Sequence, residues 1–339
     1  MSVASPEPVD YRCPLNGAMG YNALCFAGLA HWGPAQPGAP IFVAQAVDQV
    51  ADSSQDKVMH ISWRKRISRT IRGRLRARVL SKHGEGIVAN TRNGLLVVDP
   101  HDFAVCRSLL EHGSYDWTEV QWLSRILSDR SRVVFVGAHI GALLVPIALK
   151  CGSGEIVAFE PSPRNHRLLC MNVALNGLQS VVIHRMAAGE SDGTVRFTEN
   201  RINSGNSRIA ASGEVEVQVS RLDAVLPAWP QVDLLVMDTE GFEVRAMRGA
   251  AATLAKTQYF YVEYAPEQLM EQGSTPADFI ELAAEQFASM YIPGNPGRFF
   301  PDRSYVNYLK EMPMRRGLLL NLLFSKDSNP RQELSSKEP

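Results

Sequence analysis

A glycine-bracketed turn between an apolar strand and an apolar helix most constrains the fold of this 339-residue chain. The apolar run 132–136 leads into Gly137 and Gly141, a helix-like stretch follows, and a second apolar run at 155–159 ends in Glu160. Such a turn brings backbone N–H groups at a helix start close to a ligand, and a carboxylate after the next strand suits ribose hydroxyls. The pattern therefore predicts a site for a nucleoside-containing cofactor.

From residue 132 onward, apolar strand-like runs alternate with helix-like stretches. Strands separated by helices of this length predict parallel pairing in a doubly wound α/β sheet. The segment 194–219 interrupts the rhythm with alternating polar and apolar residues around a polar tip at 203–207, which predicts a hairpin-like insertion. The predicted strands are 132–136, 155–159, 180–184, 232–237, 258–263, 288–292 and 318–324, and the predicted helices are 141–150, 163–176, 241–256 and 275–287.

The residues before 132 fall into segments of different composition. Prolines break any helix in the first part, whereas Asn93-Gly94 between apolar runs at 87–98 predicts a hairpin, with a helix at 116–128 after it. Met59 is an alternative start. We predict five parts: an irregular, poorly ordered extension (1–58), a basic amphipathic helix (59–84), a hairpin and helix packed on the core (85–130), the main domain (131–326) and a polar tail (327–339).

Charge is balanced overall, with 35 basic and 35 acidic residues, but residues 59–84 contain nine basic and no acidic ones. Apolar residues recur every four positions along 61–82, as in an amphipathic helix. Two interpretations stay open: peripheral docking on an anionic membrane surface, or packing of the apolar stripe on the chain's own domain. No nucleic-acid partner is expected, because the remainder of the chain is acidic.

The five cysteines include no Cys-X-X-Cys pair, and no apolar run reaches about 18 residues. The first basic residue, Arg12, follows an acidic one, which does not match a secretory signal. We therefore expect a cytoplasmic protein without a membrane span. We expect no metal site, since no ligand spacing for a metal is present beyond one acidic loop, where a divalent ion at Asp238 and Glu240 is a minor alternative.

That acidic loop follows the apolar run 232–237 and contains Asp238, Glu240 and Glu243. Carboxylates at the carboxyl end of a parallel strand face the crevice in which such sheets bind ligands. Glu243 also suits the start of the following helix. Another strand, 258–263, ends in Glu263. Asp238 and Glu240 are the better candidates for an active site.

Seven motifs in this order resemble the FkbM family of S-adenosylmethionine-dependent methyltransferases over roughly residues 87–326. No single motif would suffice, and the specificity lies in their order. They are Val-Gly-Ala-His-Ile-Gly, Ala-Phe-Glu-Pro-Ser-Pro, Asn-Val-Ala-Leu-Asn-Gly, Ala-Ala-Gly-Glu-Ser-Asp-Gly, Ser-Arg-Leu-Asp-Ala-Val-Leu, Met-Asp-Thr-Glu-Gly-Phe-Glu and Arg-Gly-Ala.

The resemblance implies a seven-stranded Rossmann-like methyltransferase fold with S-adenosyl-L-methionine as cofactor. The resemblance also implies that 203–207 borders the acceptor. By position, it assigns Gly137, Ala138 and Gly141 to the methionine part of the cofactor, Glu160 to the ribose, Ala187 and Ala188 to the adenine, and Asp238 and Glu240 to the methyl-transfer crevice.

Two positions depart from the family pattern. Phe135 stands where the family usually has an acidic residue, and His139 where it usually has asparagine. The first change removes a polar contact to the amino-acid end of the cofactor. His139 either compensates for that loss, acts on the acceptor proton or only lines the turn.

We therefore expect an O-methyltransferase that acts on a hydroxyl of a sugar, glycolipid or secondary metabolite. Asp238, Glu240 and His139 are the candidates to position or deprotonate the acceptor. One alternative is a non-catalytic scaffold with a methyltransferase fold. Another is a nicotinamide oxidoreductase, against which the missing Gly-X-Gly-X-X-Gly fingerprint argues. The sequence indicates neither the acceptor nor the oligomeric state.

Overall fold

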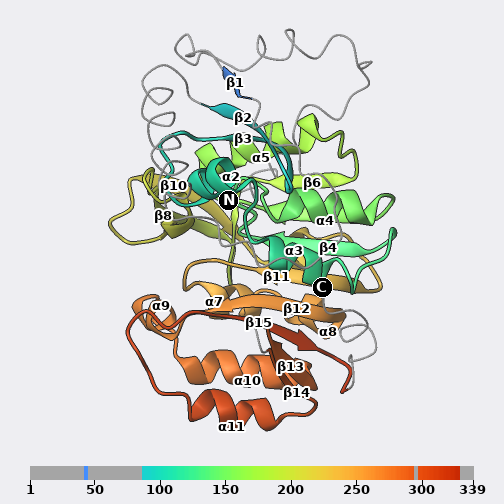
Figure 1. Ribbon diagram of the computed structural model, residues 1–339. Helices are drawn as coiled ribbons and strands as arrows, with labels where there is room; N and C mark the ends of the chain where they lie inside the picture. Colours follow the sequence, from blue (N-terminus) through green and yellow to red (C-terminus); the bar gives the residue numbers. More distant parts are fainter. Residues whose placement is uncertain (1–41, 45–85, 294–296, 329–339) are drawn as a thin grey trace, which may run out of the picture.

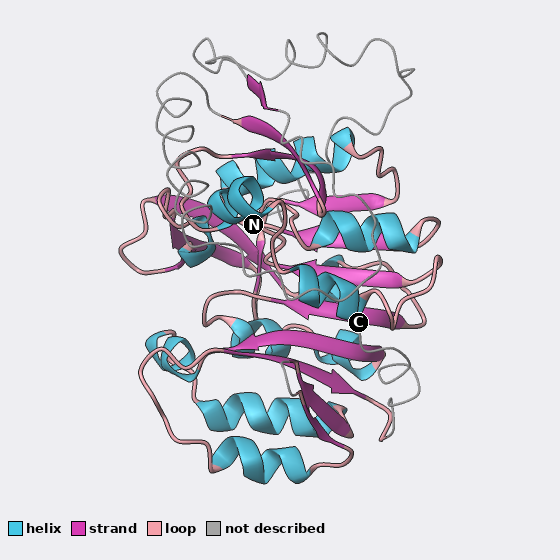
Figure 2. Cartoon of the chain, viewed as in Figure 1, coloured by secondary structure: helices cyan, strands magenta, loops and turns pink. Residues whose placement is uncertain are grey.

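The computed structural model describes residues 42–44, 86–293 and 297–328. A twisted sheet runs through the molecule, with helices on both of its faces and a smaller sheet beside one edge (Figure 1). The layers are clearest when helices and strands are coloured separately (Figure 2).

The large sheet has the strand order β14-β13-β15-β12-β11-β4-β5-β6. The central strands β6, β5, β4, β11 and β12 are mutually parallel, as the sequence predicts. This arrangement confirms the Rossmann-like α/β fold class. The bounds are β4 Arg132–Val136, β5 Glu155–Phe159, β6 Val181–His184, β11 Val232–Met237, β12 Thr257–Tyr264, β13 Ser289–Ile292, β14 Arg298–Phe300 and β15 Leu320–Ser325.

Two details of the predicted sheet were wrong. The sheet has eight strands, because β14 pairs with β13 at the edge. Strand β15 is also antiparallel to both of its neighbours, β12 and β13. Since β15 enters the sheet from the edge at which the other strands end, the loop before it lies beside their carboxyl ends. Periodicity in the sequence reports a strand but not its direction.

The helices divide between the two faces. One hydrophobic cluster packs β2, β3 and α2–α5 on one face, and a second packs α6–α11 on the other. Alternate residues of β4 show why: Val133 and Phe135 belong to the first cluster, and Val134 and Val136 to the second. The helices are α2 Val105–His112, α3 Trp117–Leu123, α4 Leu144–Cys151, α5 Pro163–Leu175, α6 Leu222–Val225, α7 Glu243–Arg248, α8 Ala251–Ala255, α9 Pro266–Glu271, α10 Pro276–Gln286 and α11 Ser304–Lys310.

The single helix predicted over 241–256 is two helices, α7 and α8, with a break at Gly249. A Cβ atom at Gly249 would lie 1.8 Å from the carbonyl oxygen of Gly189. The Gly249 carbonyl accepts a hydrogen bond from the Asp223 N–H at 3.2 Å, so it is directed away from a helical partner. A neighbouring segment thus decides the break, which periodicity could not reveal.

The predicted hairpin is present as β2 (Ile87–Thr91) and β3 (Gly94–Val98). Asn172 in α5 and Asn176, which directly follows α5, bind the free edge of β3. The Asn172 side chain accepts from Val97 N at 2.5 Å, and that of Asn176 accepts from Leu95 N at 3.0 Å. A short strand, β1 (Phe42–Ala44), pairs parallel with β2. The hairpin is therefore held on the helix layer instead of joining the large sheet.

The predicted insertion forms the smaller sheet, with strand order β7-β10-β8-β9. Strands β8 and β10 pair antiparallel, as the hairpin-like pattern predicts. The polar tip carries a 3-10 turn, η1 (Ser204–Asn206). The remaining bounds are β7 Ala187–Ala188, β8 Gly193–Thr198, β9 Arg208–Ile209 and β10 Val215–Ser220.

Several predicted parts lie outside the described residues, namely the basic helix 61–82, most of the extension 1–58 and most of the tail 327–339. The helices that are described are all too short or too polar to cross a membrane.

Candidate active site

One pocket lies at the edge where β4, β5, β11 and β12 end. The smaller sheet, the start of α2 and the loop before α3 close its sides. Its charged lining residues are carboxylates, and it includes no lysine or arginine from the described part of the chain. The lining includes Asp116, Gly137, Ala138, His139, Glu160, Met186, Ala187, Ala188, Ser204, Asp238, Glu240, Phe242, Tyr261 and Glu263.

The glycine turn forms the floor of this pocket. The N–H groups of Gly137 and Ala138 both donate to the Phe159 carbonyl, at 2.9 and 3.0 Å, which ties the ends of β4 and β5 together. Gly137 has φ +82°, and a Cβ there would lie 1.7 Å from the Asp238 carbonyl oxygen. Only glycine fits this approach of β4 to β11, and the approach brings Asp238 beside the turn.

Glu160 follows β5 and is 4% exposed. Its two carboxylate oxygens each accept a backbone hydrogen bond, from His139 N at 2.7 Å and from Ser162 N at 2.9 Å. Burial raises the pKa of Glu160 to about 7, although both hydrogen bonds oppose the shift. Each oxygen retains a lone pair, so the carboxylate can accept further hydrogen bonds from a ligand's hydroxyls.

Three carboxylates converge on the opposite side of the pocket. Asp238, Glu240 and Glu263 offer oxygens that all lie within 4.8 Å of one another. Burial, and then the neighbouring carboxylates, raise the pKa of all three, that of Glu240 to about 8. Asp238 is exposed and lines the pocket. Such a group favours a proton or a cation, either a metal ion or the charged part of a ligand.

A half-buried glutamine holds Glu240 in place. Gln268 Nε2 in α9 donates to Glu240 Oε2 at 2.8 Å. Glu243 is not part of the pocket lining: its Oε1 accepts from Thr239 N and from Thr239 Oγ1, each at 2.8 Å, and its side chain is buried at the start of α7. Glu243 therefore stabilises the loop and the start of α7, and this was one of the two roles expected for it from the sequence.

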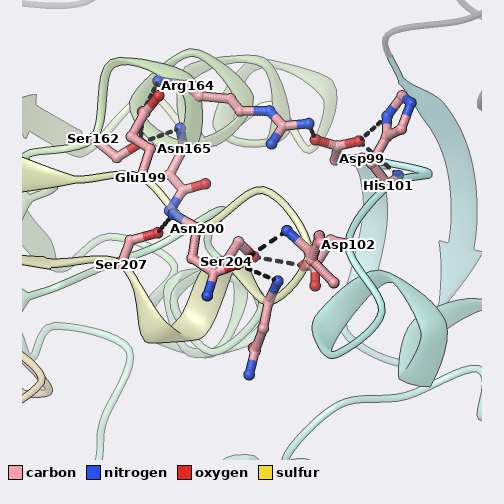
Figure 3. Close-up of polar contacts among 12 residues, drawn as sticks. Asp99, His101, Asp102, Ser162, Arg164, Asn165, Glu199, Asn200, Ser204 and Ser207 are labelled. Carbon is pink, nitrogen blue, oxygen red and sulfur yellow. Dashed lines mark hydrogen bonds and ion pairs between the residues drawn. The ribbon is translucent and has the colours of Figure 1, made fainter. Parts of the chain in front are cut away.

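His139 is joined to two loops from distant parts of the chain. Its Nε2 lies 2.7 Å from Ser204 Oγ in the insertion, and Ser204 Oγ donates to Asp102 Oδ2 at 2.6 Å. Figure 3 shows Ser204 and Asp102 turned toward each other across the two loops. Burial lowers the pKa of His139 to about 4, against the opposing effect of Asp102. The imidazole is therefore neutral at pH 7.

Backbone strain is concentrated at this pocket. Among the described residues, the non-glycine residues with left-handed φ are Asp116 (+45°), His139 (+52°) and Glu240 (+54°), and all three line the pocket. This conformation is uncommon for non-glycine residues and persists where surrounding contacts enforce it. The three titratable side chains are thus directed inward by a backbone that the rest of the fold holds.

All nine residues predicted to bind the cofactor or to act in catalysis lie in or at the pocket. Gly141 is the one outside its lining, and its N–H closes the turn by donating to Ala138 O at 2.9 Å. The order along the chain could not show that Asp116 belongs to the site. Asn93, in the hairpin turn, positions Tyr115, the residue before Asp116. The Asn93 side chain accepts from Tyr115 N at 2.9 Å and donates to Tyr115 O at 2.7 Å.

Comparison with known proteins finds similarity to methyltransferases. The family described as "Methyltransferase FkbM domain" matches residues 136–291. Methyltransferase 1 of Beauveria bassiana is 28% identical over 146 residues, which cover 36% of this chain and 59% of that protein. The 2-O-methyltransferase NoeI of Sinorhizobium fredii is 26% identical over 142 residues, 36% of this chain and 58% of that protein. The chain thus spans less than two thirds of the length of these relatives.

Among solved structures, TYW2 of M. jannaschii in complex with AdoMet is 12% identical, with a TM-score of 0.40 over 71% of this chain and 85% of that chain. A SAM-dependent O-methyltransferase of Thermotoga maritima is 13% identical, with a TM-score of 0.35 over 73% and 79%.

Proposed function

We propose that the pocket transfers the methyl group of S-adenosylmethionine to a hydroxyl of a sugar, glycolipid or secondary metabolite, because residues 136–291 match the family described as "Methyltransferase FkbM domain". The relative NoeI, whose name gives it a 2-O-methyl transfer, supports an oxygen acceptor. Bound S-adenosylmethionine supplies an electrophilic methyl group on a sulfonium. The residues of this chain bind it, orient the acceptor and hold the acceptor's proton.

The pocket residues fit this cofactor. Glu160 accepts hydrogen bonds from ribose hydroxyls, and Gly137, Ala138 and Gly141 leave the turn open to the methionine part. Ala187, 6% exposed, and Ala188, 2% exposed, border the adenine beside the larger Phe242. A lining of carboxylates without lysine or arginine, within the described residues, matches a ligand that carries a positive sulfonium and ammonium.

The acceptor enters between the glycine turn and the carboxylates at the ends of β11 and β12. Asp238 is the general base in this proposal, because it faces the pocket directly beside Gly137. A carboxylate with a raised pKa is a stronger base than an ordinary one and still loses its proton near neutral pH. Glu240 and Glu263 bind other hydroxyls of the acceptor, and Ser204 and Ser207 border it from the insertion.

One observation carries this proposal. Glu160 follows β5 and Asp238 follows β11, the strands on either side of β4, and both line a single pocket beside the turn at Gly137. The carboxylate oxygens of Glu160 suit ribose hydroxyls, and those of Asp238 suit an acceptor hydroxyl. One carboxylate thus binds the cofactor and another acts on the acceptor within the same cavity. Methyl transfer requires the two ligands to be aligned in this way.

Calorimetric titration of the full chain with S-adenosylmethionine, and with NADH as a comparison, tests the cofactor. Incubation with methyl-labelled cofactor and a panel of sugar, glycolipid and polyketide alcohols then tests transfer. Binding of S-adenosylmethionine but not NADH, with label on an acceptor oxygen, is expected. Absence of cofactor binding would overturn the proposal and favour a non-catalytic scaffold.

A further inference from the structure

Asp116 lines the pocket although it lies outside residues 136–291, which match the methyltransferase family. It directly precedes α3 and is exposed. An aspartate at this position ordinarily accepts a hydrogen bond from one of the first backbone N–H groups of the helix. Asp116 makes no such bond, and its carboxylate has no hydrogen-bond or ion-pair partner among the described residues. Both carboxylate oxygens are therefore open to a ligand in the pocket.

The surrounding fold holds Asp116 in this position. Its φ of +45° is uncommon for a residue other than glycine. Asn93 is 0% exposed and binds the backbone of the preceding Tyr115, and its Nδ2 also donates to Ala142 O at 2.8 Å, just after the glycine turn. One buried side chain thus joins the loop before α3 to the floor of the pocket, which fixes the direction of the Asp116 backbone.

Electrostatic effects place Asp116 on the acceptor side of the pocket. Burial contributes most to the raised pKa of Asp238 and of Glu263, and the charge of Asp116 raises both pKa values further. At Glu160 burial also contributes most, but the charges that raise its pKa further are those of Asp238 and Glu199. Because the effect of a charge falls with distance, Asp116 lies nearer to Asp238 and Glu263 than to the proposed ribose site.

Two aromatic side chains complete this side of the pocket. Tyr115 and Tyr261 both line it. Burial raises the pKa of both phenols, and the charges of Asp116 and Asp238 raise it further, so each ring lies near both carboxylates. The phenols keep their protons, and the rings add apolar faces to a wall that also offers hydrogen-bond acceptors. This combination suits a ligand ring that has an apolar C–H face and hydroxyls at its edge.

We propose that Asp116 binds a second hydroxyl of the acceptor, and that the acceptor is a polyhydroxylated ring, a sugar unit, instead of an alcohol with one hydroxyl. This inference rests on the proposed function. One hydroxyl gives its proton to Asp238 and takes the methyl group, and S-adenosylhomocysteine leaves. Asp116 accepts a hydrogen bond from another hydroxyl and takes no part in bond making. By holding that hydroxyl, Asp116 decides which position of the ring meets the methyl group.

The experiment incubates the full chain with methyl-labelled S-adenosylmethionine and two sets of acceptors. One set is the methyl glycosides of common hexoses and 6-deoxyhexoses, and the other is cyclohexanol and cyclohexylmethanol, which have one hydroxyl each. We expect label on a glycoside and none on the simple alcohols. Label on the simple alcohols alone, or on no acceptor although calorimetry shows bound cofactor, would overturn the sugar assignment. Absence of cofactor binding would instead overturn the proposed function, and this inference with it.

The variants Asp116→Gly and Asp116→Asn then test the residue on the glycoside that takes most label. Glycine and asparagine both tolerate the left-handed backbone, so the fold is kept. We expect Asp116→Gly to raise KM for the glycoside about tenfold, with kcat and cofactor affinity little changed. NMR of the product should show label on more than one hydroxyl. Asp116→Asn should have a smaller effect, because its amide oxygen still accepts.

The control is Asp129→Asn, at an exposed aspartate outside the pocket lining, which should leave KM and the labelled position unchanged. An unchanged KM together with a single labelled hydroxyl in Asp116→Gly would overturn the role of Asp116. A change in cofactor affinity as large as the change in KM would also overturn it, because Asp116 would then act on the pocket as a whole.

Discussion

Ser204 Oγ lies 2.7 Å from His139 Nε2 and 2.6 Å from Asp102 Oδ2. A hydroxyl has one proton, and an ionised carboxylate can only accept. Ser204 therefore donates to Asp102 and accepts from a protonated Nε2 of His139. This places the neutral imidazole in the tautomer whose Nδ1 is an acceptor. One serine thus fixes the protonation pattern of His139 and joins the insertion to the glycine turn.

Replacing this serine should both destabilise the fold and weaken the site. Ser204→Ala leaves the Nε2–H of His139 and one oxygen of Asp102 without their partner, at a cost of about 1–3 kcal/mol. We expect a Tm lower by several degrees and a weaker affinity for S-adenosylmethionine. Differential scanning fluorimetry and calorimetry measure these. Ser153→Ala, at an exposed serine that binds Asp129 O, is the control and should change neither.

Glu160→Gln tests the ribose-binding role. The amide would direct an NH2 group at one of two backbone N–H donors, His139 N or Ser162 N, where a carboxylate oxygen accepts now. We expect affinity for S-adenosylmethionine to fall about tenfold or more, measured by calorimetry. Glu190→Gln, on the exposed loop after β7, should bind like the unaltered chain. Unchanged binding by Glu160→Gln would contradict the assignment.

Asp238→Asn should separate chemistry from binding. The amide keeps the shape but cannot take the acceptor proton, so we expect kcat to fall by about 10²–10⁴ while cofactor affinity changes little. Glu240→Gln should mainly raise KM for the acceptor, because Glu240 is assigned to acceptor binding. Methyl-transfer kinetics measure both. If Asp238→Asn retained full kcat, another group would be the base.

The carboxylate-rich pocket should make the ligand-free protein less stable as pH rises from 7 to 8.5. The pKa of Glu240 is about 8 when folded, against 4.5 ordinarily, and that of Glu160 is about 7. Over this window the folded state holds more protons than the unfolded state, so the free energy of unfolding falls with pH. His139 and His166, whose pKa values are lowered to about 4, act only at lower pH.

Thermal unfolding at pH 7, 7.5, 8 and 8.5 measures this slope. The control is Glu240→Gln, which removes one of the titrating groups and should reduce the slope. An equal slope in that variant would assign the effect to other groups.

Gly137→Ala should be far more damaging than a comparable change elsewhere. The new methyl group would lie 1.7 Å from the Asp238 carbonyl oxygen, in a backbone with φ +82°. Gly113→Ala is the matched control, because Gly113 also has a left-handed φ, +70°, but has no atom within 4 Å of the added carbon. We expect Gly113→Ala to lower Tm moderately and Gly137→Ala to abolish folding or cofactor binding. Circular dichroism with calorimetry distinguishes the two effects.

Sequence alone determined the parts of this protein that depend on neighbours along the chain. The apolar runs at β4, β5 and β11 have the bounds that the sequence predicts, because burial on both faces of a parallel strand demands continuous apolar residues. The glycine turn and the carboxylates after β5 and β11 could also be predicted, because they directly follow these apolar runs in the sequence. Since parallel strands end at one edge, Glu160 and Asp238 could be expected to meet.

The tertiary structure decided whatever depends on distant segments. The antiparallel direction of β15, the break at Gly249 and the chain from His139 through Ser204 to Asp102 each arise from contacts between residues far apart in sequence. The inward position of Asp116 is of the same kind, since it rests on Asn93 in the hairpin. Local patterns report burial and turn chemistry, whereas the partner of a buried polar group is fixed only when the chain has folded.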